Sequence, residues 1–197
     1  AGNMNVAPAI SPDGKHLAFL SEKDLFGIDL FLADAKTGKI IRKLSSQISN
    51  SHIDDFNFLE SAGAWSPDSK KLFYGDSHLN LYYIDINDKK PVLVKQDNLG
   101  SHTNRTYNVL QPAWSPDSKW ISYVATLPNS VSAIYLYNID KKSHTQITDG
   151  MSGAANPSFS RDGKYLFFLA STDIALAGSG LHMSAYQRPV NYSAYAL

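Results

Sequence analysis

The chain contains no cysteine, and its charges cancel. Its 197 residues include 18 basic and 18 acidic side chains, so the formal net charge is +0 at pH 7. Without cysteine there is neither a disulfide nor a thiolate metal site. Balanced charge provides no field that would attract nucleic acid or an anionic membrane. These absences exclude a disulfide-stabilised scaffold and argue against a nucleic-acid partner.

Long apolar runs are also missing. No stretch approaches the roughly 20 apolar residues of a membrane-spanning helix, and no segment has the pattern of a signal peptide. We therefore expect no membrane span, and either a cytoplasmic chain or a mature or excised product. With 43% hydrophobic, 12% aromatic and 18% charged residues, the composition is typical of a folded β protein.

One short pattern occurs four times. The pattern is serine, any residue, aspartate and then glycine or serine. Its copies begin at Ser11, Ser66, Ser115 and Ser160. Serine and aspartate side chains bond to nearby backbone amides, and glycine accepts the left-handed conformation that closes a bend. Each copy therefore predicts a tight hairpin turn. Where serine replaces glycine, at residues 69 and 118, we expect a positive φ and some strain.

Alternating apolar segments flank every copy of the turn. Repeats of this length, with four short strands and one such turn each, predict an all-β fold of the β-propeller type. Four blade units are expected in a single domain, at about 5–46, 62–96, 111–149 and 156–197. Three units have all four strands, whereas the last lacks its outer strand, which is typical of a partial propeller.

The first and last units leave apolar surface without a neighbour. Ile10 and Phe19 of the first unit, and Phe159 and Phe167 of the last, are predicted to face outward. The final strand, over 194–197, is predicted to have a free edge. Because soluble monomers rarely expose large apolar patches, we expect self-association or further blades that complete the ring.

The connections at the two ends of the strands differ in length. First-to-second and third-to-fourth connections are tight, whereas second-to-third and between-unit connections are long. The long ones span residues 21–27, 45–63, 95–111, 149–157 and 171–191. Residues 51–62, within the second of these, fit either a helical turn or an ordered loop. Because binding residues concentrate on long loops of a rigid scaffold, the long connections mark the predicted working face.

The repeats resemble those of known propellers. Pro-Ala-Ile-Ser-Pro-Asp-Gly and Ala-Trp-Ser-Pro-Asp-Ser are similar to WD-like propeller repeats of the Tol-system type, above all in residues 5–71. Residues 72–197 resemble the amino-terminal propeller of tricorn-like serine peptidases. Their markers are Ala-Trp-Ser-Pro-Asp-Ser-Lys-Trp-Ile, Thr-Asp-Gly-Met-Ser and Phe-Phe-Leu-Ala-Ser-Thr-Asp, which begin at residues 113, 148 and 167. The resemblance implies peptide or protein ligands, no cofactor, and a periplasmic or otherwise extracytoplasmic location, with the cytoplasm left open.

Six residues of the long connections are candidate ligand-binding residues. They are His52, Asp54, His102, Arg105, Tyr107 and Arg188. The guanidinium of Arg188 suits a peptide carboxylate, which it can bind with two parallel hydrogen bonds. The alternative is that these side chains are solvated and bond only to loop carbonyls. The histidines lack the close spacing of metal ligands, so no metal site is expected.

No residue is assigned to catalysis. The serines lack a Gly-x-Ser-x-Gly elbow, and Gly178-Ser-Gly180 precedes no helix that could help cradle a phosphate. We therefore predict a non-catalytic propeller that binds or gates peptide or protein ligands, as in a tricorn-like serine peptidase. A stand-alone periplasmic Tol-type interaction propeller and a scaffold segment of a larger assembly are the alternatives. Peptidase activity in a longer parent protein stays open.

Overall fold

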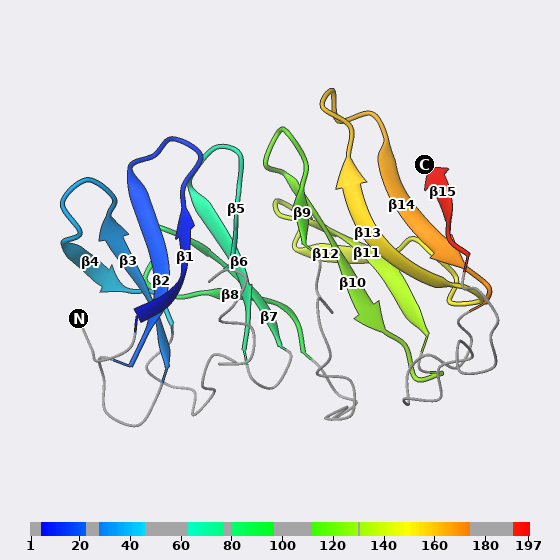
Figure 1. Ribbon diagram of the computed structural model, residues 1–197, viewed down its shortest axis with the longest axis horizontal. Coiled ribbons are helices and arrows are strands. Elements are labelled where there is room, and N and C mark those ends of the chain that lie inside the picture. The colour runs from blue at the N-terminus through cyan, green and yellow to red at the C-terminus, as the bar shows by residue number, and fades with distance from the viewer. Residues whose placement is uncertain are drawn as a thin grey trace. The chain divides into compact units, whose positions relative to one another are not determined.

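Antiparallel sheets are the regular secondary structure of the described part of the chain (Figure 1). The computed structural model describes residues 5–22, 28–45, 63–76, 80–96, 112–129, 131–173 and 191–197. No helix occurs in these ranges. The chain divides into two compact units, Ala1–Asn98 and Leu99–Leu197. The all-β prediction is confirmed, whereas the blade limits and the single domain stay predictions.

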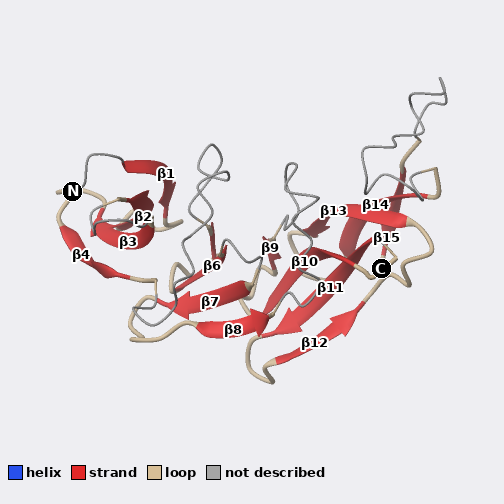
Figure 2. Cartoon of the chain, turned by 90° about the horizontal axis from the view of Figure 1, so that it is seen from below, coloured by secondary structure: helices blue, strands red, loops and turns tan. Residues whose placement is uncertain are grey.

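The first unit contains two four-stranded sheets, here called blades 1 and 2. In each blade the strands pair in chain order, β1-β2-β3-β4 and β5-β6-β7-β8, as in the strand view of Figure 2. Blade 1 comprises β1 (Asn5–Ile10), β2 (His16–Ser21), β3 (Asp29–Asp34) and β4 (Ile40–Lys43). Blade 2 comprises β5 (Ala64–Trp65), β6 (Lys71–Gly75), β7 (Leu81–Asp85) and β8 (Val92–Lys95).

The second unit contains one four-stranded and one three-stranded sheet, blades 3 and 4. Blade 3 comprises β9 (Ala113–Trp114), β10 (Trp120–Thr126), β11 (Ser132–Asn138) and β12 (Ser143–Gln146). Blade 4 comprises β13 (Gly153–Phe159), β14 (Leu166–Ser171) and β15 (Ser193–Ala196), paired in that order. Four sheets of this kind, the last without an outer strand among the described residues, confirm the predicted propeller-type blades.

Strand β13 is longer than expected. The prediction placed a strand at 158–159 and a loop over 149–157, but β13 already begins at Gly153. Ala154 is 1% exposed and pairs with Ala170, so burial of this segment holds it in the sheet. The register shifts between Ala155 and Ser158, where Asn156 has a φ of 54°. This bulge lets the longer strand keep its pairing on both sides.

Each unit buries its own apolar core between its two blades. Alternation along β2 and β3 turns Leu20, Leu30 and Leu32 toward blade 2, where they pack with Leu72 and Ile84. In the second unit, Val124 and Ile134 of blade 3 pack with Leu166 of blade 4. Phe159 also packs partly buried against this second core, so its predicted outward orientation is wrong.

Every blade carries a stacked aromatic pair across its second and third strands. The four pairs are Phe19–Phe31, Tyr74–Tyr82, Tyr123–Tyr135 and Phe168–Tyr195, with ring centroids 5.6–5.9 Å apart. The two rings of each pair belong to directly opposite residues. Phe19 is consequently only 9% exposed, so it is not the open surface residue that was predicted, whereas Ile10 and Phe167 are 63% and 46% exposed as expected.

Candidate functional site

The six candidate ligand-binding residues lie outside the described residues. His52, Asp54, His102, Arg105, Tyr107 and Arg188 therefore stay predictions, as does the alternative of a helical turn or a loop over 51–62. What the structure shows is the scaffold that bounds them. In each blade the connections alternate between the two ends of the strands, so each candidate belongs to a connection at the end of its own blade that is opposite the repeated turn.

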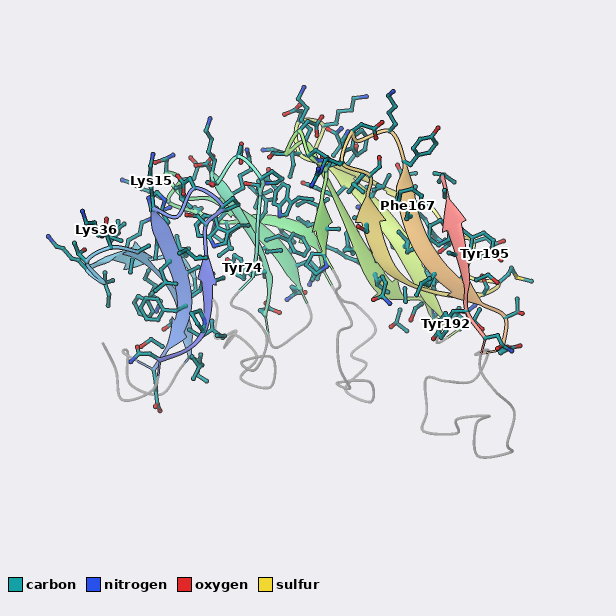
Figure 3. All side chains as sticks on the ribbon, turned by 45° about the horizontal axis from the view of Figure 1, so that its top comes forward. Lys15, Lys36, Tyr74, Phe167, Tyr192 and Tyr195 are labelled. Carbon is teal, nitrogen blue, oxygen red and sulfur yellow. The ribbon has the colours of Figure 1, made fainter. Side chains whose placement is uncertain are left out.

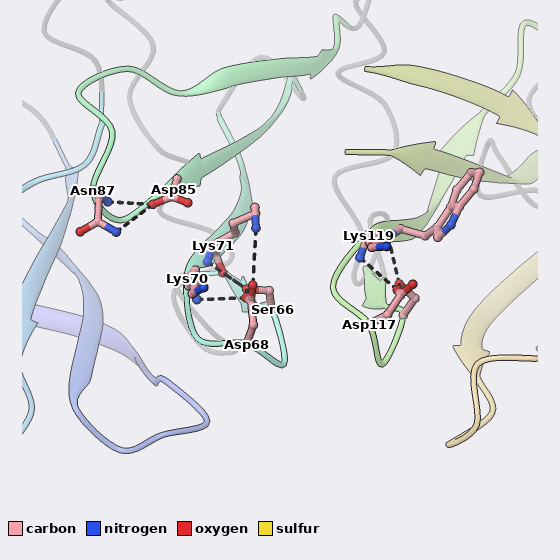
Figure 4. Close-up of polar contacts among 10 residues, drawn as sticks. Ser66, Asp68, Lys70, Lys71, Asp85, Asn87, Asp117 and Lys119 are labelled. Carbon is pink, nitrogen blue, oxygen red and sulfur yellow. Dashed lines mark hydrogen bonds and ion pairs between the residues drawn. The ribbon is translucent and has the colours of Figure 1, made fainter. Parts of the chain in front are cut away.

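The repeated turn has the same hydrogen bonds in all four blades. In blade 1 the Ser11 hydroxyl donates to Asp13 Oδ1 at 2.6 Å, and the backbone N–H of Lys15 donates to the same oxygen at 3.1 Å. The backbone N–H of His16 then donates to Ser11 Oγ at 2.9 Å. These bonds recur at Ser66 and Asp68, Ser115 and Asp117, and Ser160 and Asp162. Figure 4 shows the turns of blades 2 and 3.

Hydrogen bonding keeps the turn carboxyls ionised. The Ser11 hydroxyl and the Lys15 N–H lower the pKa of Asp13, and the equivalent serine and lysine bonds lower those of Asp117 and Asp162. For Asp68 burial acts in the opposite direction, but the Ser66 hydroxyl, the Lys70 N–H and the Lys71 ammonium together outweigh it, so its pKa is also lowered. These carboxylates are occupied in holding their own turns.

Three lateral hydrogen bonds join blade 1 to blade 2. Ser69 has a φ of 60°, and its Oγ accepts the N–H of Asp13 at 3.0 Å. The Trp65 indole donates to the carbonyl oxygen of Ala9 at 2.9 Å. A third bond, from Arg42 Nη2 to the carbonyl oxygen of Asp85, measures 3.2 Å. The turn end of the strands is therefore a hydrogen-bonded framework, which suits a structural part more than a binding surface.

At the opposite end, blade 2 holds a buried carboxylate. Asp76 is 4% exposed and accepts the backbone N–H and the side-chain amide of Asn80, at 2.9 and 3.0 Å. The Tyr82 hydroxyl donates to it at 3.3 Å. Burial and then the charge of Asp76 raise the pKa of Tyr82, and burial chiefly raises that of Tyr74. The predicted ligand-binding residues do not include this cluster, although its Asp-x3-Asn spacing is visible in the sequence.

An apolar groove of about 540 Å³ lies on blade 1. Its lining residues come from β1 to β4 and the connection between β3 and β4: Asn5, Val6, Pro8, Leu17, Phe19, Ala33, Gly38 and Ile40. Leu17 and Phe19 alternate with Ala18 and Leu20, which pack with blade 2, so this alternation in β2 is the sequence signal for the groove. No cluster of three or more histidine or acidic side chains suited to a metal ion occurs in the part of the chain that is described.

Comparison with known proteins identifies the architecture. The fold is similar to that of a putative TolB from Agrobacterium tumefaciens, with a TM-score of 0.56 and 21% identity over 83% of this chain. It is also similar to the tricorn protease, with a TM-score of 0.61 and 19% identity over 80% of this chain. The four sheets are β-propeller blades. They resemble Tol-type blades and those of the tricorn propeller.

Sequence comparison also finds a tricorn-like relative. The chain is 29% identical over 165 residues to the uncharacterized protein Atu1656 of Agrobacterium fabrum, and 30% identical over 107 residues to a putative tricorn-like protease C-terminal subunit of Sulfurisphaera tokodaii. No family model matches the chain. These matches cover 84% and 54% of this chain.

The propeller chain spans only part of each relative. It covers 50% of the Agrobacterium fabrum protein and 12% of the Sulfurisphaera protein. Among the structures it covers 53% of the TolB chain and 14% of the tricorn protease. The described part of the chain also contains no helix that is long and apolar enough to span a membrane.

Proposed function

We propose that the chain is a non-catalytic propeller segment that binds or gates peptide or protein ligands, as the propeller of a tricorn-like serine peptidase would. The observation that carries the proposal is a difference between the two ends of the strands in each blade. At the turn end, serine, aspartate and backbone groups bond to each other in every blade. The connections at the other end carry the candidates His52, Asp54, His102, Arg105, Tyr107 and Arg188.

A stand-alone Tol-type interaction propeller is the second candidate. It is favoured by the likeness to TolB, of which this chain covers more than it covers of the tricorn protease. On either function the partner is a peptide or protein, and we propose an extracytoplasmic location on the Tol-type resemblance. We also propose that further blades or other copies cover the exposed Ile10 and Phe167.

Binding of peptides with a free carboxyl terminus tests this function. Fluorescein-labelled hexapeptides with a free carboxylate are titrated against the chain, and amidated versions serve as the matched ligands. Arg105→Ala, His102→Ala and Arg188→Ala should each weaken carboxylate binding by about tenfold, the value of one charge-assisted hydrogen bond. The melting temperature should stay nearly unchanged.

Two lysines on the turn end provide the control. Lys36 and Lys142 are exposed and lie in the third-to-fourth connections of blades 1 and 3. Figure 3 labels Lys36. Lys36→Ala and Lys142→Ala should change neither affinity nor melting temperature. If these two variants lose peptide binding while the loop variants retain it, the ligand binds at the turn end and the proposed function is assigned to the wrong face.

A further inference from the structure

The three lateral hydrogen bonds between blades 1 and 2 all lie near the turn end of the strands. Their donor and acceptor residues are Asp13 and Ser69, Trp65 and Ala9, and Arg42 and Asp85. Blades 3 and 4 pack on each other in the second unit, and their repeated turns, between β9 and β10 and between β13 and β14, lie at the same end of the strands (Figure 1). Because the blades repeat, each lateral bond has equivalent positions there.

The hydroxyl acceptor of the first bond is replaced in blade 4. Ser69 is the fourth residue of the blade 2 turn, and the fourth residue of the blade 4 turn is Gly163, which has no side-chain oxygen. Its φ of 72° is close to the 60° of Ser69. A Cβ on Gly163 would lie 3.7 Å from Cδ of Pro116, the residue before Asp117. Residue 163 therefore lies beside the blade 3 turn but lacks the atom that would bond to it.

The indole donor of the second bond is also replaced. Phe159 takes the place of Trp65 directly before the turn, and its ring has no N–H. The equivalent acceptor in blade 3 is the carbonyl oxygen of Ala113, which accepts the Ser122 hydroxyl of its own blade at 3.3 Å. In blade 1 the place of Ser122 is taken by Ala18, which has no hydroxyl. The carbonyl that joins two blades in the first unit is thus bonded within one blade in the second.

The guanidinium donor of the third bond has no counterpart in blade 3. Arg42 pairs with Leu32, the residue after the stacked aromatic ring of β3. The equivalent residue of β11 is Leu136, and it pairs with Thr145, which is exposed and carries only a hydroxyl on Cβ. The side chains that form the three lateral bonds of the first unit are therefore all replaced in the second.

Blades 3 and 4 are tied at the other end of the strands. Their apolar side chains share one core, and at the long-connection end the Asn129 side-chain amide donates to the Gly150 carbonyl oxygen at 3.2 Å. Gly150 has a φ of 80°, and a Cβ there would lie 2.2 Å from Cδ1 of Leu127. The chain enters β13 through residues 150–153, which begin and end with glycine. Such a segment can absorb the backbone changes of a hinge.

We propose that the boundary between blades 3 and 4 is an opening seam. The blades separate at the turn end and pivot about residues 150–153, while each blade keeps its strand pairing and blades 1 and 2 stay joined. One net hydrogen bond changes such an equilibrium by about fivefold, so three of them make opening about a hundredfold rarer between blades 1 and 2. This conformational device goes beyond the proposed function, since it does not depend on the ligand.

Single introduced thiols report the opening, because the chain has no cysteine. Leu166 and Leu72 occupy the same place after the turns of blades 4 and 2, and are 4% and 0% exposed in the cores that these blades share with blades 3 and 1. Leu166→Cys and Leu72→Cys are reacted with a thiol reagent below the urea transition, and each rate is divided by that of the unfolded variant. Labelling of Leu166→Cys should be about a hundredfold faster.

A third thiol tests the position of the pivot. Ala154 is 1% exposed in the same core but lies next to residues 150–153. The thiol of Ala154→Cys should react at least about tenfold more slowly than that of Leu166→Cys. Circular dichroism confirms that the variants fold. If Leu166→Cys does not, Val124→Cys, a substitution nearly neutral in volume in this core, takes its place.

Urea separates opening of the seam from unfolding. Parting two intact blades exposes much less surface than unfolding them, so the labelling rate of Leu166→Cys should change little at low urea concentration. The labelling rate of Leu72→Cys should instead rise steeply with urea, because that thiol reacts only when the first unit unfolds.

Substitutions at residue 163 test the missing bond. Gly163→Ser supplies an oxygen for the Asp117 N–H, whereas Gly163→Ala adds a Cβ at the same positive φ without a hydroxyl and is the matched control. With Leu166→Cys in both chains, serine should slow labelling about fivefold relative to alanine. Conversely, Trp65→Phe should speed the labelling of Leu72→Cys about fivefold, because it removes the indole donor.

Several results would overturn the proposal. They are equal labelling of Leu166→Cys and Leu72→Cys, an equally steep urea dependence of both, and equal labelling with serine and alanine at residue 163. Faster labelling of Ala154→Cys than of Leu166→Cys would also overturn it, since the blades would then part at the wrong end. No peptide is present in these measurements, so their failure is distinct from a failure of the peptide titrations that test the proposed function.

Discussion

At the scale of single residues, Ser69 shows how a hydrogen bond to the neighbouring blade can offset backbone strain. The sequence predicts that glycine would be better at residues 69 and 118, and both serines do have a φ of 60°. From strain alone, Ser→Gly would stabilise either turn by about 0.4–1 kcal/mol. Ser69, however, also accepts the N–H of Asp13 from the neighbouring blade. Its side chain therefore offsets the strain of its backbone.

The two substitutions at Ser69 separate these effects. Ser69→Gly removes the strain and the hydrogen bond together, so its free energy of unfolding should stay within about 0.5 kcal/mol of the parent. Ser69→Ala keeps the strain but loses the bond, and should be destabilised by about 1 kcal/mol. Urea unfolding measures both. Equal stability of the alanine variant and the parent would mean that the Asp13 bond contributes nothing.

At the scale of elements, the blades are held by the side chains that alternate toward the neighbouring blade. Leu72 of β6 is 0% exposed and packs in the core shared by blades 1 and 2. Leu93 of β8 belongs to the same blade but is 47% exposed. Alanine at each of these two positions therefore compares the loss of a side chain buried between blades with the loss of an exposed side chain in the same blade.

Leu72→Ala should lower the free energy of unfolding by about 3 kcal/mol, since it leaves a cavity between two sheets. Leu93→Ala, the matched control, should cost less than about 0.5 kcal/mol. Thermal and urea unfolding followed by near-ultraviolet circular dichroism would detect the difference. Similar small losses in both variants would show that the two blades do not share a tightly packed core.

At the scale of the whole molecule, the repeated turns link stability to pH. The pKa values of Asp13, Asp68, Asp117 and Asp162 are lowered in the folded chain, in most cases chiefly by hydrogen bonds from the turn. The unfolded chain, whose aspartates titrate near 3.8, then binds more protons at acidic pH than the folded chain. The stabilisation from these four aspartates is present above the pKa of the unfolded chain. It is lost as the pH falls through their lower pKa values in the folded chain.

We therefore expect stability to be nearly constant from pH 7 to 5 with respect to these groups and to fall between about pH 4 and 2. Asp117→Asn should lose about 1 kcal/mol at pH 7, a value kept small because the side chain is exposed, and should show a shallower acid decline. Urea midpoints at pH 3, 4, 5 and 7 measure both effects. Asp140→Asn, at an exposed turn of the same blade, is the control. An unchanged pH slope in Asp117→Asn would contradict the linkage.

The sequence by itself determined the turns and the strands that they join. The bonds from Ser11 to Asp13 and from the His16 N–H to Ser11 lie within six residues, so the local sequence contains both partners. Apolar alternation likewise indicates which strands exist, because side chains of a strand point to opposite faces. Four copies of this local information were enough to predict propeller-type blades. For the same reason the positive φ of Ser69 and Ser118 was predictable.

The tertiary structure decided what depends on distant partners. Asp13 and Ser69 are 56 residues apart in sequence, so no local pattern reveals their bond. Phe19 is covered through its stack with Phe31, whereas Phe159 lies against the other blade of its unit, a difference that alternation alone does not resolve. From the sequence, the candidate site was predictable only as a set of long connections between strands. Trp65 and Ala9 are likewise 56 residues apart in sequence, and only the packing of blade 2 beside blade 1 brings the indole N–H to the Ala9 carbonyl oxygen.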